Sequence, residues 1–236
     1  MPTINTINGK YRYKIVPIYL GWKPIDKDKA FNNLCLFKKI ADKNNFRFIL
    51  AYGTLLGAVR ERDFIEHDED IDLAASFSDK ELFLSMLFEL RDNGFEVARW
   101  DSRGLMTIIR DNEYIDIYFF KKHNPKLSIN SGMPLPTKFL ADTAAITFKG
   151  VDFDAPADTT DALEFWYGKD WQTPVPWLDF HRPKWKTMLT KAIIIIRPHI
   201  PEPLLRPILK KKEKEKFNKY LNRGVLNEYL TDNSDI

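Results

Sequence analysis

The spacing of apolar side chains predicts one long helix and a series of short strands in the first half of the chain. Over residues 27–44 the apolar positions recur every three or four residues, which gives one buried helical face, and Asp26 can cap its beginning. Short runs rich in β-branched and aromatic residues predict strands that pair into a sheet. These runs are residues 46–52, 71–75, 95–100, 105–110 and 114–120.

Helix signals stand between these runs. Gly53 and Thr54 open a short helix over the sequence TLLGAVRER, and Ser78 to Glu81 form a capping box for a helix that Gly94 ends. Helices placed among strands in this way are typical of an α/β (α+β) fold with one mixed β-sheet flanked by helices.

Beyond residue 121 the chain changes character. Residues 145–155 predict a hairpin and residues 158–168 a short helix, before a connector rich in Pro and Trp at 171–177. We divide the chain into a domain of residues 1–181 and a basic, Pro-containing helical segment of residues 182–236. A loop is expected where prolines recur, at Pro125, Pro134 and Pro136.

Composition sets the class of protein. With 236 residues, of which 44% are hydrophobic, the chain can bury one globular core, which excludes disorder and coiled coil. The longest fully apolar run, residues 192–196, is far shorter than the ~20 residues that span a bilayer. The N-terminus lacks the pattern of a secretory signal, and the single Cys35 is expected to be a core residue. We expect a cytoplasmic protein without a membrane span.

The net charge of +3 is a sum of unlike parts. Residues 1–181 hold 23 Lys and Arg against 27 Asp and Glu, whereas residues 182–223 hold 13 against 3. This basic segment favours an anionic partner. Two interpretations stay open: it lies on an anionic membrane surface at the inner face of the membrane, or it packs on the core with a solvated Lys-rich helix. Nucleic acid is disfavoured, because the cations lack interleaved stacking aromatics before Phe217 and no nucleic-acid motif is present.

The acidic run that ends at Asp72 is the richest in chemistry. Asp68, Glu69, Asp70 and Asp72 fall within five residues, and such carboxylates repel one another when unpaired. Asp70 and Asp72 enter a strand on one face, with the residue between them turned into the core. Paired carboxylates open to solvent bind a hard cation, so we expect Mg²⁺ or Mn²⁺.

A further carboxylate, Asp116, lies in the apolar strand predicted at residues 114–120. A lone charge there costs several kcal/mol unless it is paired or metal-bound. If this strand neighbours the one that carries Asp70 and Asp72, the three side chains converge on one metal or flank an acceptor hydroxyl.

Gly53 and Thr54 form the other half of the candidate site. A glycine that leaves a buried strand lets the backbone approach a phosphate, and the Thr54 hydroxyl with the following amides can hold an anion. Packing alone also explains such a turn in many α/β proteins. Arg60 lies about two turns along the helix, where it can pair with a phosphate or with the acidic run.

The sequence YGTLLGAVR, followed by FI and by HDEDIDL, closely resembles the LicD family of phosphotransferases. The resemblance continues through YIDIYFF around Asp116 and weakly into LEFWYGKDW, so it covers about residues 30–177. It implies a nucleotidyltransferase fold of the polymerase-β type. It also implies transfer of a phospho-substituent from a CDP-linked alcohol to a sugar hydroxyl of a cell-surface glycan or its lipid-linked precursor, with release of CMP.

The resemblance also implies roles for individual residues. Asp70 and Asp72 hold the metal, and Asp116 is a further ligand or the base. Asp68 orients these groups. His67 stands where many members have Trp; it contacts donor or metal, or is only a solvated loop residue. The residues implied in nucleotide and phosphate binding are Gly53, Thr54, Gly57 and Arg60.

Two other functions stay open at this point. One is a conventional nucleotidyltransferase that moves a nucleoside monophosphate and releases pyrophosphate. The other is a noncatalytic module that binds a membrane or a glycan. The transferred group could be phosphocholine, phosphoethanolamine, glycerol phosphate or ribitol phosphate.

Overall fold

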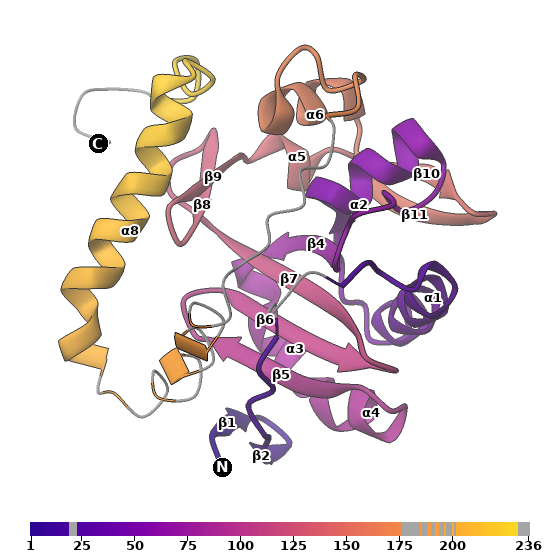
Figure 1. Ribbon diagram of the computed structural model, residues 1–236, viewed down its shortest axis with the longest axis vertical. Helices are drawn as coiled ribbons and strands as arrows, with labels where there is room; N and C mark the ends of the chain where they lie inside the picture. Colours follow the sequence, from indigo (N-terminus) through magenta and orange to yellow (C-terminus); the bar gives the residue numbers. More distant parts are fainter. Residues whose placement is uncertain are drawn as a thin grey trace.

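A mixed β-sheet with helices packed around it forms the body of the protein (Figure 1). The computed structural model describes residues 1–18, 23–175 and 202–230, and single positions between 185 and 200. In the sheet, β4 (Ile71–Ser76) and β7 (Glu113–Lys122) run parallel, and the other pairs are antiparallel. The order is β3-β4-β7-β6-β5, and β8 and β9 extend the far end of β7. This confirms the predicted mixed sheet.

The remaining bounds follow the chain. The other strands are β1 (Thr3–Thr6), β2 (Gly9–Arg12), β3 (Ile49–Leu50), β5 (Glu96–Asp101), β6 (Leu105–Arg110), β8 (Leu127–Asn130), β9 (Met133–Pro136), β10 (Thr143–Phe148) and β11 (Val151–Pro156). The helices are α1 (Lys27–Lys43), α2 (Tyr52–Leu56), α3 (Lys80–Ser85), α4 (Leu87–Asp92), α5 (Lys138–Ala141), α6 (Thr159–Tyr167) and α8 (Glu202–Asn222).

The predicted helix over residues 27–44 is confirmed as α1. The Asp26 carboxylate accepts a hydrogen bond from the Lys29 amide, which caps the first turn. Its buried face contributes Phe37 to an aromatic cluster that also contains Phe83 of α3. There Phe83 packs edge-on against Phe119 of β7, with ring centres 5.5 Å apart, and lies 6.3 Å from Phe37 of α1. These helices therefore cover one face of the sheet.

Alternation along β7 divides its side chains between two environments. Ile117 and Phe119 belong to the buried core that includes the helix-covered face. Asp116 and Tyr118 point to the opposite face, where Tyr118 meets the ring of Tyr52. A two-residue turn, Asp111-Asn112, joins β6 to β7 with positive φ angles of 52° and 66°, the geometry of a type I′ turn.

Two predicted elements are wrong in their bounds. The strand expected at residues 46–52 is reduced to two residues, because β3 pairs only with β4 and Tyr52 already begins α2. The helix expected from the box at Ser78 is interrupted at Met86. Ser76, not Ser78, accepts the capping hydrogen bond, and a short 3₁₀ turn (Phe77–Asp79) precedes α3.

The helix expected after Gly53 is present in a modified form, since α2 continues as a π-helical turn (Gly57–Glu61). The loop expected at the prolines is wrong, because residues 127–136 form the hairpin β8–β9. Pro134 and Pro136 fit there because β9 pairs with β8 alone and needs few ladder donors. The hairpin expected at 145–155 is confirmed as β10–β11, and the helix at 158–168 as α6 with Asp158 as its cap.

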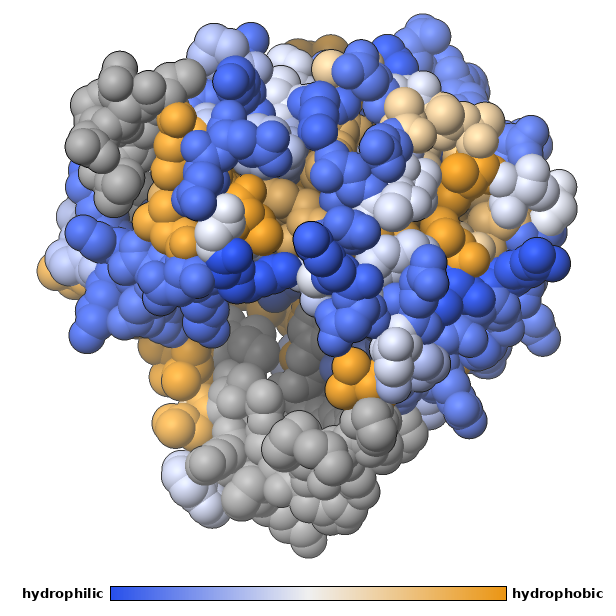
Figure 2. Space-filling view, turned by 90° about the horizontal axis from the view of Figure 1, so that it is seen from above, coloured by the Kyte–Doolittle hydropathy of each residue, from blue (hydrophilic) through white to orange (hydrophobic). Residues whose placement is uncertain are grey.

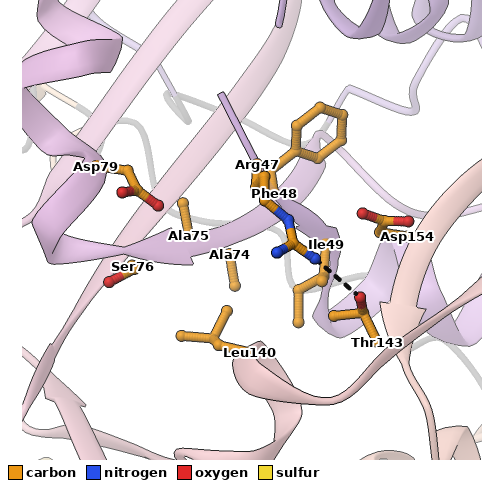
Figure 3. Close-up of a pocket in the computed structure, with 10 residues that line it drawn as sticks. All are labelled: Arg47, Phe48, Ile49, Ala74, Ala75, Ser76, Asp79, Leu140, Thr143 and Asp154. Carbon is orange, nitrogen blue, oxygen red and sulfur yellow. Dashed lines mark hydrogen bonds between the residues drawn. The ribbon is translucent and has the colours of Figure 1, made fainter. Parts of the chain in front are cut away.

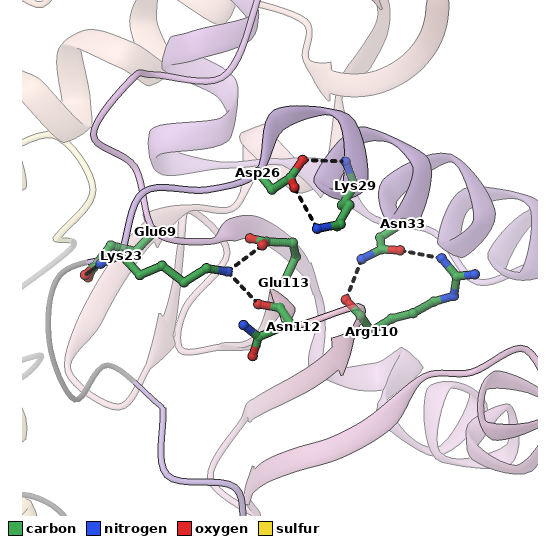
Figure 4. Close-up of polar contacts among 8 residues, drawn as sticks. All are labelled: Lys23, Asp26, Lys29, Asn33, Glu69, Arg110, Asn112 and Glu113. Carbon is green, nitrogen blue, oxygen red and sulfur yellow. Dashed lines mark hydrogen bonds and ion pairs between the residues drawn. The ribbon is translucent and has the colours of Figure 1, made fainter.

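A polar network ties the N-terminal arm to the sheet (Figure 4). The Lys23 ammonium lies 2.5 Å from the carboxylate of Glu113, which is only 2% exposed, and so compensates its buried charge. The Lys23 amide donates to Glu69 in the acidic run. On the neighbouring helix, Asn33 donates to the Arg110 carbonyl and accepts from the Arg110 guanidinium. The network holds the acidic run and α1 against the β6–β7 turn.

The C-terminal helix α8 packs alongside the β8–β9 hairpin (Figure 1). Phe217 and Tyr220 pack against the core, and Tyr220 stacks on Phe165 of α6. The Arg223 guanidinium donates to the carbonyls of Phe165 and Trp166. One side of this basic helix is thus fixed to the body, as the packing interpretation expects, and its Lys residues face solvent. The start of the basic segment lies largely outside the described residues.

On the face seen from above, hydrophilic residues make up most of the coloured area, and apolar residues reach it in separate groups (Figure 2). Among the described helices, none has both the length and the apolar character needed to cross a bilayer.

The contact between α8 and the hairpin gives a first testable prediction. A Cβ on Gly132, which has a φ of 82°, would overlap the backbone of Glu213 in α8. Gly150 has nearly the same φ, 83°, but open space around it. Both substitutions place an alanine in the left-handed backbone region, which destabilises each variant to a similar degree. Only Gly132→Ala adds the overlap with Glu213, so we expect it to lower the free energy of unfolding by about 1–2 kcal/mol more than Gly150→Ala. Chemical denaturation of both variants measures the difference, and equal losses would show that α8 does not rest on this turn.

Candidate active site

Four polar side chains form a row across four neighbouring strands. In the registers of the sheet, Arg99 of β5 pairs with Thr107 of β6, Thr107 with Asp116 of β7, and Asp116 with Asp72 of β4. Residues in register share a face, so the row lies on the side of the sheet away from the Phe83 cluster. The predicted neighbourhood of Asp72 and Asp116 is therefore present.

Asp116 is held as a carboxylate by donors on its own sheet. It is 2% exposed; Thr107 donates a short hydrogen bond to Oδ1, and the Arg99 guanidinium lies 2.9 Å from Oδ2. The Tyr118 hydroxyl approaches Oδ2 at 3.4 Å. Arg99 also donates to the Thr107 hydroxyl, which closes the group. The charge that looked costly in an apolar strand is thus compensated by protein groups.

Sequence reasoning did not find Arg99 and Thr107. The signal for Arg99 was weak, because its strand also carries the charged residues Glu96 and Asp101, whereas Asp116 stands among apolar and aromatic residues. Neither residue reveals its partner without the register of the sheet.

Asp72 is buried at the start of β4, and its backbone is fixed by the turn before α2. Its amide donates to the Thr54 hydroxyl at 2.8 Å, and its carbonyl accepts from the Ala51 amide at 3.1 Å. The Gly53 amide donates to its carboxylate. The Thr54 hydroxyl, fully buried, thus positions the strand; its contact with a phosphate stays a prediction.

Electrostatics around Asp72 are unfavourable. Burial raises the pKa of its carboxyl well above the usual range, and the neighbouring Asp70, Asp68 and Asp116 raise it further. The Gly53 hydrogen bond opposes this only in part. A cation bound between these carboxylates would remove the repulsion.

Asp68 lies directly against Gly53. A Cβ at residue 53 would come within 2.5 Å of Asp68 Oδ2, so any side chain there would require the Asp68 carboxylate to move. Burial raises the pKa of Asp68 to about 6, and its Oδ2 has no hydrogen-bond partner in the described part of the chain. Gly57 has a packing role, since a Cβ there would lie 2.6 Å from the Asp63 carbonyl. Asp63 is itself held by two lysines, Lys27 and Lys149.

A cleft of about 300 Å³ opens beside Gly53 and Asp68. Arg60 and His67 line it together with the aromatic Tyr167 and Trp171. The Arg60 guanidinium donates to Glu61 at 2.7 Å and to the Trp171 carbonyl at 3.1 Å. Of the two predicted roles of Arg60, these contacts favour an ion pair with an acidic residue over binding of a phosphate. Arg60 nevertheless lines the cleft, so a phosphate bound there could still reach it. The three predicted metal-binding aspartates are not part of the lining of this cleft.

Tyrosine side chains surround the buried carboxylates. Burial and the negative charge of Asp72 raise the pKa of Tyr52, Tyr118 and Tyr167 above the usual range, so the phenols stay protonated. The Tyr52 hydroxyl has no hydrogen-bond partner within the described residues. These groups can donate hydrogen bonds but cannot act as bases.

The donor set around Asp72 fits a hard divalent cation. It consists of carboxylate oxygens, which Mg²⁺ and Mn²⁺ prefer, and their mutual repulsion is what a cation relieves. In the residues that the structure describes, no three carboxylate, imidazole or thiolate side chains already stand together as a metal-binding group. The metal roles of Asp70, Asp72 and Asp116 stay predictions.

A smaller pocket of about 90 Å³ lies at the other end of β4 (Figure 3). The Arg47 guanidinium crosses it toward Thr143, and Ser76 and Asp154 stand at its sides. It contains none of the candidate residues, so the chemistry is concentrated at the beginning of β4.

Comparison with known families supports the sequence resemblance. Residues 45–158 match the family described as LicD/FKTN/FKRP, nucleotidyltransferase domain. Ribitol-5-phosphate transferase FKTN of Macaca fascicularis is 28% identical over 160 residues, and that of Homo sapiens is 27% identical; each match covers 63% of this chain and 34% of the relative. Uncharacterized protein RT0683 of Rickettsia typhi is 29% identical over 105 residues, 43% of this chain and 33% of that protein. The chain thus spans about a third of these relatives.

Solved structures give weaker matches. Lincosamide antibiotic adenylyltransferase LnuA has a TM-score of 0.43 at 12% identity, covering 69% of this chain and 96% of its own. Antibiotic-resistance factor ANT(2'')-Ia has a TM-score of 0.46 at 12% identity, covering 86% of this chain and 97% of its own.

Proposed function

The chain carries a nucleotidyltransferase domain of the LicD family, and from this we propose that it is a phosphotransferase. It moves a phospho-substituent from a CDP-linked alcohol to a sugar hydroxyl of a cell-surface glycan or its lipid-linked precursor, and CMP leaves. The observation that carries the proposal is the register of β4 and β7, which sets Asp72 beside Asp116 on the face of the sheet away from the Phe83 cluster.

The donor would bind at the beginning of β4. Asp70 and Asp72 would hold Mg²⁺ or Mn²⁺, which supplies positive charge for the donor diphosphate when it is bound. The Gly53 amide donates to the Asp72 carboxylate at the start of α2, and the absence of a side chain at residue 53 leaves Asp68 in its position beside them. These groups orient the phosphorus for in-line displacement.

The acceptor hydroxyl would lie at Asp116. Its oxygen forms a bond to the phosphorus that carries the alcohol, the bond between that phosphorus and the bridging oxygen breaks, and CMP departs with the electron pair. The hydroxyl proton passes to Asp116, whose carboxylate is already oriented by Thr107 and Arg99. The buried site and its protonated tyrosines limit access of water.

The alcohol that the CDP-linked donor carries is not fixed by this proposal. Two relatives whose aligned regions cover 63% of this chain are named ribitol-5-phosphate transferases. CDP-ribitol is therefore the first donor to test. CDP-glycerol, CDP-choline and CDP-ethanolamine complete the series.

We expect the purified chain to release CMP from one of these four donors when Mg²⁺ or Mn²⁺ and a saccharide acceptor are present. Chromatography of nucleotides, with detection of the modified acceptor by mass spectrometry, measures both products. Release of pyrophosphate from a nucleoside triphosphate, with no CMP from any donor, would instead identify a conventional nucleotidyltransferase. Absence of both products together with absence of metal-dependent stabilisation would indicate a noncatalytic binding module.

A further inference from the structure

The first half of α8 exposes apolar side chains that do not pack on the body of the protein. Leu204 is 69% exposed and Ile208 is 56% exposed. These two residues are four positions apart, so they lie on the same side of the helix. In the second half of α8, by contrast, Phe217 and Tyr220 pack against the core. The second half thus docks the helix, and the first half keeps an apolar surface in contact with solvent.

The docked side and the exposed apolar side of α8 face in different directions. Nine residues, which make about two and a half turns, separate Ile208 from Phe217 and place the two side chains on opposite sides of the helix. Leu205 and Leu209 are half-buried, and they extend the apolar side of the first half without joining the side chains packed on the core. The docking of α8 therefore does not explain why its first half is apolar.

Every charged residue among these apolar residues is a cation. Residues 204–212 include four basic residues and no acidic one, and the four are Arg206, Lys210, Lys211 and Lys212. All four are exposed, and none forms an ion pair within the part of the chain that the structure describes. A second copy of the chain would bring cations against cations here, so this charge opposes self-association and favours an anionic partner.

The described positions that precede α8 have the same apolar character. More than half of the large apolar side chains that are exposed in the described part of the chain lie between residues 185 and 208, about a tenth of its length. Those that precede α8 are Trp185, Met188, Leu189, Ile193 and Ile196. Exposed apolar side chains concentrated in this way are typical of an interaction surface.

We propose that the first half of α8 is a docking surface for an anionic lipid bilayer. Leu204 and Ile208 enter the headgroup region, while the neighbouring Lys and Arg side chains bury their aliphatic stems and keep their charged ends at the lipid phosphates. An acidic headgroup attracts each of these cations, and a neutral headgroup does not. The inference goes beyond the proposed function, because it rests on the exposed side chains of α8 and its test needs no turnover.

The first experiment compares Ile208→Ser with Ile7→Ser. Ile7 is 80% exposed in the turn between β1 and β2, so each variant loses one exposed isoleucine and neither opens the core. Flotation of the full chain with vesicles of phosphatidylglycerol and phosphatidylcholine measures its affinity for an anionic bilayer. We expect Ile208→Ser to weaken binding about tenfold, because one apolar side chain no longer enters the bilayer, and Ile7→Ser to leave it unchanged.

A second pair of variants tests the charge. Lys211 is exposed on α8, and Lys10 is exposed on β2, so substitution of either by Gln removes one surface charge without affecting the core. We expect Lys211→Gln to weaken binding to the phosphatidylglycerol vesicles about fivefold and Lys10→Gln to leave it unchanged. Vesicles of phosphatidylcholine alone should bind the unmodified chain about 10²-fold more weakly, since the attraction of all four cations is then lost.

Equal binding of Ile208→Ser and Ile7→Ser to the anionic vesicles would overturn this surface, and so would equal binding of the unmodified chain to both kinds of vesicle. Analytical ultracentrifugation without lipid tests a different occupant: a dimer that dissociates in Ile208→Ser would assign this side of α8 to a second copy and overturn the proposal. Vesicle binding that depends on Ile208 in a protein that releases no CMP would support the surface while refuting the proposed function. The two failures are therefore distinguishable.

Discussion

Asp116→Asn is expected to reduce transfer by about 10²- to 10⁴-fold, the range that loss of a general base produces. An asparagine offers one acceptor oxygen where the carboxylate now accepts from Thr107 on one side and from Arg99 on the other. It cannot take the hydroxyl proton, and it leaves the Arg99 cation without its anion. Steady-state release of CMP measures the loss in kcat.

Glu113→Gln is the matched control. Glu113 is a buried carboxylate on the same strand, it is paired with Lys23, and an odd number of residues places it on the other face from Asp116. Both substitutions remove the charge of a buried carboxylate that is paired with a partly exposed cation, so they should lower stability to a similar degree, but only Asp116→Asn should reduce transfer by this factor. Asp70→Ala should abolish transfer. Retained turnover in both Asp70→Ala and Asp116→Asn would refute the assignment.

Asp72→Asn is expected to stabilise the metal-free protein and to remove its response to metal. The amide keeps an acceptor for the Gly53 N–H but ends the repulsion with Asp70, Asp68 and Asp116, so the Tm of the metal-free variant should be higher than that of the unmodified protein. In the unmodified protein, Mg²⁺ or Mn²⁺ at 100 times its Kd should add about 2.7 kcal/mol. Thermal unfolding with and without metal measures both effects.

Asp101→Asn provides the comparison for Asp72→Asn. Its carboxylate pairs with Arg103 at the far end of the row, so this variant should lose stability and keep the full metal response. A metal-dependent rise in Tm that persists in Asp72→Asn would place the cation away from the beginning of β4.

Much of the fold could be predicted because it depends on local patterns. The Asp26 cap and the apolar face of α1, the hairpin β10–β11, and the strands β5 to β7 each follow from residues close together in the sequence. The N-terminal hairpin β1–β2 also has a local signal in Asn8 and Gly9, since its loop consists of Ile7 and Asn8 and Gly9 begins β2 with a φ of 116°. The interruption between α3 and α4 at Met86 has no such local signal, because helix propensities do not reveal it.

The candidate site was predictable only in part. Asp72 and Asp116 could be inferred because carboxylates are costly in apolar strands, and the resemblance to LicD proteins supplied the rest. The partners of Asp116 depend on strand registers between segments that are distant in sequence, so Arg99 and Thr107 were invisible.

The type I′ turn at Asp111-Asn112 sets a limit on how this sequence can change. It fixes Arg110 opposite Glu113 and hence Thr107 opposite Asp116. Gain or loss of one residue in that turn would shift the β6–β7 register and move either Thr107 or Asp116 to the helix-covered face. Chains that share this chemistry should therefore vary in the identity of these two turn residues but not in their number.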